Sequence, residues 1–434
     1  MTDTLTIRGT TPKGQAGLSG EARVPGDKSI SHRALILGAL AHGTNQIEGW
    51  LEAGDTLATL GALRALGVDV RKEGSRLTFQ GGNLKPPSGP LDCANAGTAM
   101  RLLAGLLAGQ PFPSALDGSP QLRRRPMGRI TRPLRAMGAR IADVGGYPPL
   151  IIEPAQLKGE THHLEVASAQ VKSAILLAGL FAEGPTTVVE LGPSRDHTER
   201  MLRAMGAQVA VEGRRIDLTP DHARLEPLCL AVPGDLSSAA FLIVAAAIVP
   251  GSDVRIAGVG LNPTRAGLLD ILTRMGASIG VEERAEQGGE PTGALRVRYA
   301  VLQGTTVAGD EVVRAIDELP ILAVAATQAV GETRIKNAAE LRLKEVDRIA
   351  LLAQELRTLG AEVEEFPDGM AIYGPTPLSG ASVSSHGDHR LGMALAVAGL
   401  VADGETLICD AACIADSYPG FAETLARLGA GIRL

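Results

Sequence analysis

Residues 24–33 read VPGDKSISHR and lead directly into the apolar run 34–41. Pro25 and Gly26 interrupt any preceding strand, and Asp27 can cap the segment that follows. Because the apolar residues after position 33 continue at helical spacing, the stretch predicts a turn that opens a helix. Ser29 is a second candidate for the cap.

The first turn of this predicted helix is cationic. A helix N-terminus already carries partial positive charge and normally attracts acidic side chains, so Lys28 and Arg33 indicate an anionic partner. Together with the Ser29 hydroxyl and the unpaired N–H groups, they describe a phosphate or carboxylate site. A solvated basic turn beside an acidic neighbour is the alternative on this stretch alone.

Composition narrows the class of protein. The chain has 434 residues, 45% hydrophobic and 21% charged, which predicts a globular protein of two or three domains. The net charge of −6 and an aromatic content of 3% argue against a nucleic-acid binder, which would need a basic field and stacking side chains. Local cations on an acidic protein favour a small anionic ligand instead.

The cysteines and the apolar runs indicate the compartment. Cys93, Cys229, Cys409 and Cys413 are too sparse for a disulfide scaffold, and the last two lack the partners of a zinc site. We expect structural thiols, no metal and a reducing environment. The first residues, 1–4, lack the basic and apolar regions of a signal peptide, and the longest apolar run, 239–249, is far below the ~20 residues that span a bilayer. We therefore expect a cytoplasmic protein without membrane contact.

Two helical patterns alternate along the chain. In the first, an amphipathic helix ends in Leu or Met and is followed by a glycine and an alternating strand, because glycine suits the left-handed position after a helix. These glycines are Gly67, Gly138, Gly206, Gly276, Gly360 and Gly429. In the second, an apolar helix of small residues precedes a β-branched strand, as expected for a buried helix. The apolar runs are 34–41, 100–108, 174–182, 239–249, 319–330 and 393–401.

These patterns repeat at about 70 residues, too long for the common solenoids, so we predict six βαβαββ units in an α/β (α+β) fold. Three units per domain is the natural division, with a boundary near Pro233-Gly234-Asp235.

Polar residues without a packing role cluster where the buried helices begin. The clusters are 28–33, 95–101, 168–173, 235–238, 317–320 and 388–390. If the repeats fold alike, these helix N-termini face one interdomain cleft, which would attract a polyanion. Each turn taken singly could be an ordinary cap.

Two further segments carry cations. In 123–126, we expect Arg123 and Arg124 to be solvated. In 343–348, Lys344, Asp347 and Arg348 are spaced to share a helix face, with Glu345 offset from them. Glu345 is a candidate proton carrier, and a structural ion-pair network is the competing explanation.

The motifs, in their order, resemble the EPSP synthase (3-phosphoshikimate 1-carboxyvinyltransferase) family over essentially the whole chain. The motifs that carry the resemblance are 25–33 (PGDKSISHR), 95–101 (NAGTAMR), 125–127 (RPM), 168–170 (SAQ), 317–320 (DELP), 344–348 (KEVDR) and 388–390 (DHR). The resemblance implies the two-domain enolpyruvyl-transferase fold. It divides the chain into one discontinuous domain, 1–22 with 235–434, and a second domain, 23–234.

The resemblance also implies the reaction. The 5-hydroxyl of shikimate 3-phosphate would attack C2 of phosphoenolpyruvate while C3 is protonated, and phosphate would leave from a non-covalent tetrahedral adduct. The step belongs to aromatic amino acid (chorismate) biosynthesis and needs no cofactor or metal. We expect a monomer that acts on these two small molecules.

Residue roles follow from the same resemblance. The implied 3-phosphoshikimate contacts are Lys28, Ser29, Arg33, Ser168, Ala169, Gln170, Asp317 and Lys344. The implied phosphoenolpyruvate contacts are Lys28, Gly97, Arg125, Gln170, Arg348 and Arg390. Asp317 would be the base near the 5-hydroxyl and Glu345 the acid toward C3, with Lys28 as a third catalytic group.

The chain departs from one branch of the family at two positions. Ala169 stands where that branch has Ser, and Asp416 stands where it has a Lys that reaches phosphoenolpyruvate, so a cationic contact near the C-terminus is in doubt. Gly97 is present where Ala is associated with tolerance of the herbicide glyphosate. The sequence therefore predicts inhibition by glyphosate.

Two other functions compete with this interpretation. The sister enzymes that use UDP-N-acetylglucosamine carry Lys-Asn in the first loop and usually a reactive Cys in a mobile loop. Here Ser29 follows Lys28, and 117–125 contains no Cys. A non-catalytic phosphometabolite-binding protein is the second alternative, and the presence of both Asp317 and Glu345 argues against it.

Overall fold

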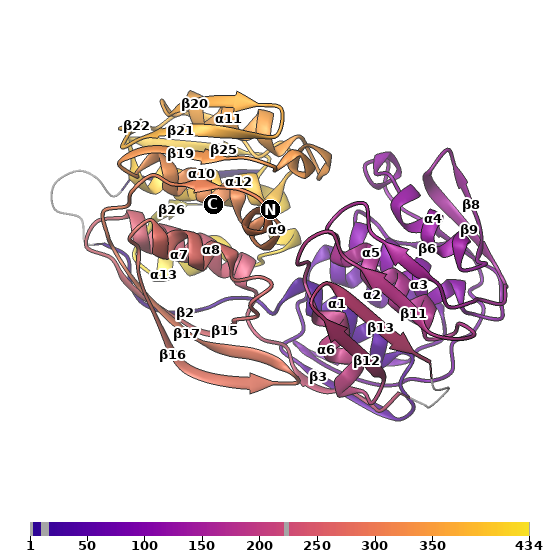
Figure 1. Ribbon diagram of the computed structural model, residues 1–434. Helices are drawn as coiled ribbons and strands as arrows, with labels where there is room; N and C mark the ends of the chain where they lie inside the picture. Colours follow the sequence, from indigo (N-terminus) through magenta and orange to yellow (C-terminus); the bar gives the residue numbers. More distant parts are fainter. Residues whose placement is uncertain (1–2, 10–16, 221–224, 434) are drawn as a thin grey trace. The chain divides into compact units, whose positions relative to one another are not determined.

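The computed structural model describes residues 3–9, 17–220 and 225–433. The chain forms two compact units, each built from segments distant in sequence (Figure 1). Unit 1 comprises Met1–Pro25, Gly234–Ala285 and Pro291–Leu434, and unit 2 comprises Gly26–Pro233 and Glu286–Glu290. Each unit has its own hydrophobic core.

Unit 2 contains three four-stranded sheets of identical topology. In each, the first two strands are parallel and the remaining neighbours are antiparallel. The sheets are, in spatial order, β14 (Cys229–Ala231), β3 (Thr44–Glu48), β5 (Arg76–Gln80) and β4 (Val70–Glu73); β6 (Leu91–Asp92), β7 (Ser114–Asp117), β9 (Tyr147–Glu153) and β8 (Arg140–Val144); and β10 (Thr161–His163), β11 (Thr186–Val189), β13 (Arg215–Thr219) and β12 (Gln208–Glu212).

Unit 1 repeats this arrangement, and in each of its three four-stranded sheets the first two strands are again parallel. Their orders are β2 (Ser19–Arg23), β15 (Asp253–Gly260), β17 (Glu290–Arg298) and β16 (Ser278–Gln287); β18 (Thr306–Val307), β19 (Gly331–Ile335), β21 (Gly369–Gly374) and β20 (Glu362–Phe366); and β23 (Ser382–Ser384), β25 (Glu405–Cys409), β1 (Thr4–Arg8) and β26 (Gly431–Arg433). A two-stranded sheet pairs β22 (Leu378–Ser379) with β24 (Ala402–Asp403). The predicted α/β class and the six repeats are confirmed.

Two strands are exchanged between repeats. β2 precedes the first buried helix of unit 2 but pairs with β15 of unit 1, with Ala22 opposite Ile256. Conversely, β14 precedes the first buried helix of the second half of the chain but pairs with β3, with Leu230 opposite Ile47. β1 completes the sheet of the last repeat. The pairings of β1 and β2 explain why the N-terminal segment belongs to unit 1 together with the second half of the chain.

Six buried helices form the centres of the two cores. They are α1 (Lys28–Gly38), α3 (Gly97–Ala108) and α5 (Ala169–Gly179) in unit 2, and α7 (Leu236–Ile248), α10 (Leu319–Thr327) and α12 (His389–Val401) in unit 1. α3 packs against α1 and α5, and α10 packs against α7 and α12. A Cβ at Gly105 would lie 2.2 Å from the carbonyl oxygen of Ala174, so the close approach of α3 and α5 requires glycine there.

The amphipathic helices of the repeats end as predicted. They are α2 (Gly54–Ala65), α4 (Gly128–Ala136), α6 (His197–Ala204), α8 (Gly267–Arg274), α11 (Arg348–Thr358) and α13 (Phe421–Arg427). The six predicted glycines follow the helix caps with φ between 85° and 100°, a left-handed region open to glycine. The remaining helical segments are α9 (Asp310–Ala315), η1 (Leu122–Arg124), η2 (Ala339–Leu343) and η3 (Ala411–Asp416).

Within the described part of the chain, every helix is too short or too polar to traverse a lipid bilayer.

Candidate active site

The cationic turn predicted from the sequence forms the start of α1. The Asp27 carboxylate caps the helix by accepting from the N–H of Ile30 at 2.9 Å, so Asp27, and not Ser29, is the cap. Lys28 is the first helical residue, and its Nζ lies 3.2 Å from Oδ2 of Asp55. Lys28 is therefore held beside an acidic neighbour.

Arg33 is 3% exposed and joins three segments of unit 2. Its Nε donates to Oγ1 of Thr198 at 2.8 Å, and its Nη2 donates to Oγ of Ser173 at 2.7 Å. Nη1 donates to the carbonyl oxygen of Ser29 at 3.0 Å. The guanidinium therefore fixes the first turn of α1 against the starts of α5 and α6.

His32, in the same turn, is fully buried, with Nδ1 2.7 Å from Oγ1 of Thr59. Burial lowers the pKa of His32 to about 3, and the charges of Lys28 and Arg33 act in the same direction. The imidazole is thus neutral near pH 7, and the charge of the turn comes from the lysine and the arginine.

The start of α5 is joined to α3. Ser168 caps α5 by accepting from the N–H of Val171. Gln170 accepts at Oε1 from Arg101 at 2.7 Å and donates from Nε2 to Thr98 at 2.8 Å. Two of the predicted helix starts, residues 95–101 and 168–173, therefore lie side by side in unit 2.

Gly97, the first residue of α3, faces two guanidinium groups. A Cβ at this position would lie 2.8 Å from Nη1 of Arg125 and 2.9 Å from Nη1 of Arg101. Such distances are shorter than van der Waals contact, so the arginines could not occupy these positions beside alanine. Gly97 and Arg125, predicted from separate motifs, are thus in direct proximity.

The loop that carries Arg125 is hydrogen-bonded to the turn before Gly97. Ser119 Oγ donates to Oδ1 of Asn95 at 3.2 Å and accepts from the N–H of Leu122 at 3.1 Å. The Asn95 amide donates to Oε1 of Gln121 at 3.0 Å. Arg123 is exposed, as predicted, although it pairs with Asp117.

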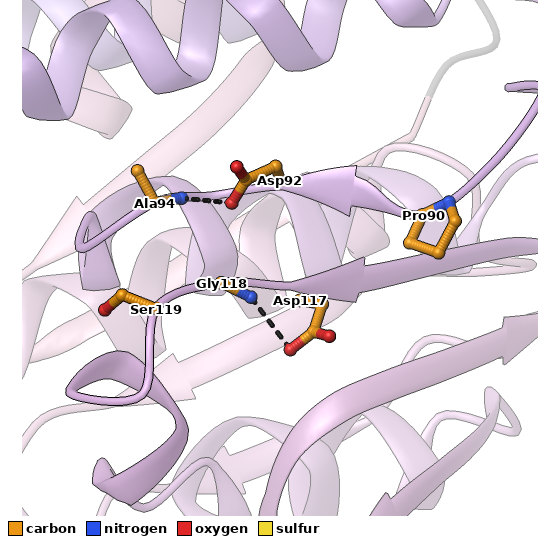
Figure 2. A pocket seen from close by; sticks show the side chains of 6 residues that line it. All are labelled: Pro90, Asp92, Ala94, Asp117, Gly118 and Ser119. Atoms are coloured by element: carbon orange, nitrogen blue, oxygen red, sulfur yellow. Dashed lines mark hydrogen bonds between the residues drawn. The ribbon is translucent and has the colours of Figure 1, made fainter.

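A pocket of about 490 Å³ lies at the ends of β6 and β7, behind these loops, and is lined by Pro90, Asp92, Ala94, Asp117, Gly118 and Ser119. Figure 2 shows that Asp92 accepts from the N–H of Ala94 and Asp117 from the N–H of Gly118, each at 2.8 Å. None of these lining residues is a predicted substrate contact. The two carboxylates instead hold the turns that precede Gly97 and Arg125.

Arg195 was missed by the sequence analysis. Its Nη1 lies 3.3 Å from Oγ of Ser29, so a further cation reaches the start of α1. Arg195 lies two residues before α6, and the signal that could have found it is a cation near the start of a helix, as with Lys28 at the start of α1.

In unit 1, Asp317 lies among three cations. Its Oδ1 is 3.5 Å from both Nζ of Lys344 and Nη1 of Arg348, and its Oδ2 is 3.8 Å from Nη2 of Arg390. Arg390 also donates from Nη1 to the carbonyl oxygen of Asp317 at 3.0 Å. The structure thus brings together the predicted residues of three separate motifs.

Arg348 is 1% exposed and is surrounded by carboxylates. Nε donates to Oδ2 of Asp388 at 2.8 Å, and Nη2 donates to Oε2 of Glu345 at 2.6 Å. Burial alone would lower the pKa of Arg348, but the charges of Asp388, Glu345 and Asp317 raise it. Arg348 is therefore a permanently charged group at the centre of this cluster.

The prediction that Lys344, Asp347 and Arg348 share one face of a helix is wrong. Asp347 caps α11 by accepting from the N–H groups of Ile349 and Ala350, so the helix begins only at Arg348. Lys344 and Glu345 lie in the turn between η2 and α11. The turn allows Glu345 to reach Arg348, while Lys344 approaches Asp317.

The turn after Asp317 is held by a buried network. Glu318, 2% exposed, accepts a hydrogen bond from Ser237 Oγ. Arg265 donates from Nη2 to both Ser237 and Asp235, the latter at 2.8 Å. The network ties the start of α10 to the start of α7. Asp416, in contrast, is an exposed residue at the end of η3.

Among the residues that the structure describes, no three His, Cys, Asp or Glu side chains are grouped as metal ligands would be. The chemistry available to the clusters is that of anion binding by cations and proton transfer by carboxylates.

Comparison with known proteins agrees with this geometry. The family model for EPSP synthase (3-phosphoshikimate 1-carboxyvinyltransferase) matches residues 12–425. A 3-phosphoshikimate 1-carboxyvinyltransferase from Acidithiobacillus ferrooxidans is 54% identical over 408 residues, covering 93% of this chain and 94% of the relative. A protein of the same name from Desulforamulus reducens is 50% identical over 414 residues, covering 94% and 96%.

Solved structures give the same result. An EPSP synthase from Acinetobacter baumannii superposes with a TM-score of 0.89 at 43% identity, covering 99% of both chains. The enolpyruvyl transferase NikO from Streptomyces tendae, at 21% identity and a TM-score of 0.80, covers 99% of this chain and 98% of its own and shares the fold. On the family match and the two relatives together, this chain belongs to the EPSP synthase family.

Proposed function

We propose that the residue clusters of the two units bind shikimate 3-phosphate and phosphoenolpyruvate and catalyse transfer of the enolpyruvyl group between them. As a member of its family, the chain is an enolpyruvyl transferase of aromatic amino acid biosynthesis. The products are 5-enolpyruvylshikimate 3-phosphate and phosphate. The observation that carries the assignment of residues is the position of Asp317 within 4 Å of Lys344, Arg348 and Arg390.

For the acceptor substrate, we assign the phosphate to the starts of α1 and α5. Lys28, Ser29 and Arg33 supply two cations and a hydroxyl, and the N-terminal N–H groups of the helices add partial positive charge. Ser168, Ala169 and Gln170 supply the second helix start. Asp317 and Lys344 would contact the ring hydroxyls.

For phosphoenolpyruvate, we assign the planar guanidinium groups. Arg125, Arg348 and Arg390 have the fork geometry that suits a carboxylate or a phosphate. Gly97 leaves room for Arg125 beside the helix start. Lys28 and Gln170 would contact both substrates.

The proposed mechanism uses two carboxylates. Asp317 accepts the proton of the 5-hydroxyl as its oxygen bonds to C2 of phosphoenolpyruvate, and Glu345 delivers a proton to C3. The adduct then loses that proton from C3, and the C2–O bond to phosphate breaks, so the enol ether and phosphate leave.

The cations have two tasks in this scheme. They hold two anionic substrates together against their mutual repulsion, and they stabilise the charge on the departing phosphate. We assign Lys28 to holding the substrates together and Arg348 to stabilising the departing phosphate.

We further propose that glyphosate inhibits the enzyme by occupying the phosphoenolpyruvate contacts. Glyphosate is a small dianion with a carboxylate and a phosphonate, so the same guanidinium groups would bind it. The short distances from Gly97 to Arg125 and Arg101 support this proposal. A side chain at position 97 would displace these guanidinium groups, whereas glycine leaves them in place for the inhibitor. We also propose that the enzyme is a cytoplasmic monomer.

The direct test is identification of the product. The purified chain is incubated with both substrates, and the mixture is followed by proton and phosphorus NMR. We expect new vinyl signals of an enol ether in a ratio of one to the phosphate released. Phosphate release without the enol ether would indicate simple hydrolysis and would contradict the proposal.

A further inference from the structure

Lys172 is a buried cation that the mechanism above does not use. It lies two residues after Gln170 on α5 and is 1% exposed. Its Nζ is 2.7 Å from Oε1 of Glu199, 3.0 Å from Oε2 of Glu190 and 3.4 Å from the carbonyl oxygen of Ser194. Because these three partners engage the amino group, we expect Lys172 to act through them.

All three partners belong to one segment, residues 190–199. Glu190 directly follows β11, and Glu199 lies in the first turn of α6. Ser194, between them, also donates from its hydroxyl to Glu190. Lys172 therefore holds the connection between β11 and α6 at both ends and in its middle.

The same segment contacts the first turn of α1. Arg195 lies 3.3 Å from the Ser29 hydroxyl, and Thr198 accepts from Nε of Arg33 at 2.8 Å. Thr198 also lies 2.7 Å from Oγ of Ser173, the neighbour of Lys172 on α5. The position of residues 190–199 thus sets the position of two groups that we assign to the phosphate of the acceptor.

The first turn of α6 is fixed at three consecutive residues. His197 Nδ1 lies 2.7 Å from Oε1 of Glu290, and both side chains are at most 2% exposed. Thr198 contacts Arg33, and Glu199 contacts Lys172. A turn with three buried partners has little freedom to shift when substrate binds.

Charge in this cluster is unbalanced. One lysine faces two carboxylates, and burial raises the pKa of Glu190, although Lys172 and the Ser194 hydroxyl oppose the shift. Oε2 of Glu199 is buried without a hydrogen bond from the described residues. Removal of the lysine would therefore leave two buried carboxylates in mutual repulsion, which would push the segment apart.

We propose that Lys172 is a positioning residue for the acceptor substrate: by pairing with Glu190 and Glu199, it fixes segment 190–199 so that Arg195 and Thr198 hold Ser29 and Arg33 in place for the phosphate. This inference rests on the proposed function. It predicts that the cluster governs affinity for shikimate 3-phosphate and has little effect on phosphoenolpyruvate.

The test compares K172M with E190Q, and K158M serves as the matched control. Lys158 is an exposed lysine of the same unit outside the cluster. Titration calorimetry gives Kd for shikimate 3-phosphate, and steady-state kinetics give KM for each substrate and kcat. We expect Kd and KM for shikimate 3-phosphate to rise about 10-fold or more in K172M, because small displacements of binding groups are costly.

E190Q keeps the size of the side chain and removes one of two repelling charges, so it should fold. It removes one of the two charged partners of Lys172, and we expect a smaller rise in the same Kd. KM for phosphoenolpyruvate should stay within about 2-fold of the wild type in both variants, and K158M should match the wild type throughout. A purely structural role would lower Tm and leave both KM values unchanged.

Two results overturn the inference. One is a folded K172M that binds shikimate 3-phosphate as tightly as the wild type. If K172M does not fold, the second is an E190Q variant whose Kd for shikimate 3-phosphate equals that of the wild type. If the wild type itself fails to bind shikimate 3-phosphate, it is the proposed function that fails.

Discussion

Nη1 of Arg348 lies 3.5 Å from Oδ1 of Asp317, while the rest of the same guanidinium is bonded to Asp388 and Glu345. The buried arginine thus connects the proposed base with the proposed acid. Because Asp388 also caps α12, the guanidinium is aligned by the helix start that carries Arg390. Arg348 therefore pairs with all three carboxylates of the cluster, Asp317, Glu345 and Asp388.

Replacement of Asp317 by Ala should lower kcat by a factor of about 10² or more, the usual contribution of a positioned general base. The Kd for shikimate 3-phosphate should change little, because the phosphate contacts that we propose lie on α1 and α5. Phosphate release and calorimetric titration measure the two quantities. An unchanged kcat would remove Asp317 from the mechanism.

Replacement of Arg348 by Met should lower the free energy of unfolding by about 3–5 kcal/mol, because Asp388, which is 0% exposed, would lose its counter-charge. The matched control is R8M, since Arg8 pairs with Glu405 at the surface, and this pair should contribute at most about 1 kcal/mol. Urea denaturation provides the comparison. Equal decreases in the free energy of unfolding for R348M and R8M would show that the buried pair stabilises the protein no more than the surface pair.

Substitution of Gly97 by Ala should raise KM for phosphoenolpyruvate and weaken inhibition by glyphosate, each by about 10-fold. The reason is steric, because the new methyl group would lie 2.8 Å from Arg125 and 2.9 Å from Arg101. Gly61, an exposed helical glycine without neighbours within 4 Å, supplies the control G61A, which should leave both values unchanged. A wild type that keeps its full turnover in micromolar glyphosate would refute the inhibitor assignment.

Stability should fall in acid because of His32. The pKa of His32 is about 3 in the folded protein, compared with the ordinary value of 6.5 expected in the unfolded chain. Below pH 6.5, the unfolded chain therefore binds a proton that the folded chain does not. The free energy of unfolding should therefore decrease by about 1.4 kcal/mol per pH unit between pH 6 and 4 from this residue. H32Q should have a correspondingly shallower slope, measured by urea denaturation at several pH values. The exposed His42 provides the control H42Q, and identical slopes in all three proteins would contradict the prediction.

Local signals allowed much of the fold to be predicted. The six glycines after helix caps and the cap at Asp27 are recognisable from a few neighbouring residues, so the helices were found close to their observed bounds. The exchange of β2 and β14 depends on pairings across more than 170 residues, such as Leu230 with Ile47, and no local pattern encodes them. The same limit applies to the contact of Arg195 with Ser29, which are 166 residues apart.

The prediction of a shared helix face failed for a local reason. The spacing of Lys344, Asp347 and Arg348 fits a helix, but an aspartate can also cap one, and Asp347 does so. The helix therefore begins only at Arg348, and Lys344 and Glu345, which precede the cap, contact Asp317 and Arg348 instead. Spacing alone cannot distinguish an interior aspartate from a capping one.

The most direct test of the central claim is a phosphate-release assay with phosphoenolpyruvate and two alternative acceptors, shikimate 3-phosphate and UDP-N-acetylglucosamine. We predict catalytic release with shikimate 3-phosphate and none above background with the nucleotide sugar. Turnover with UDP-N-acetylglucosamine and none with shikimate 3-phosphate would contradict the account.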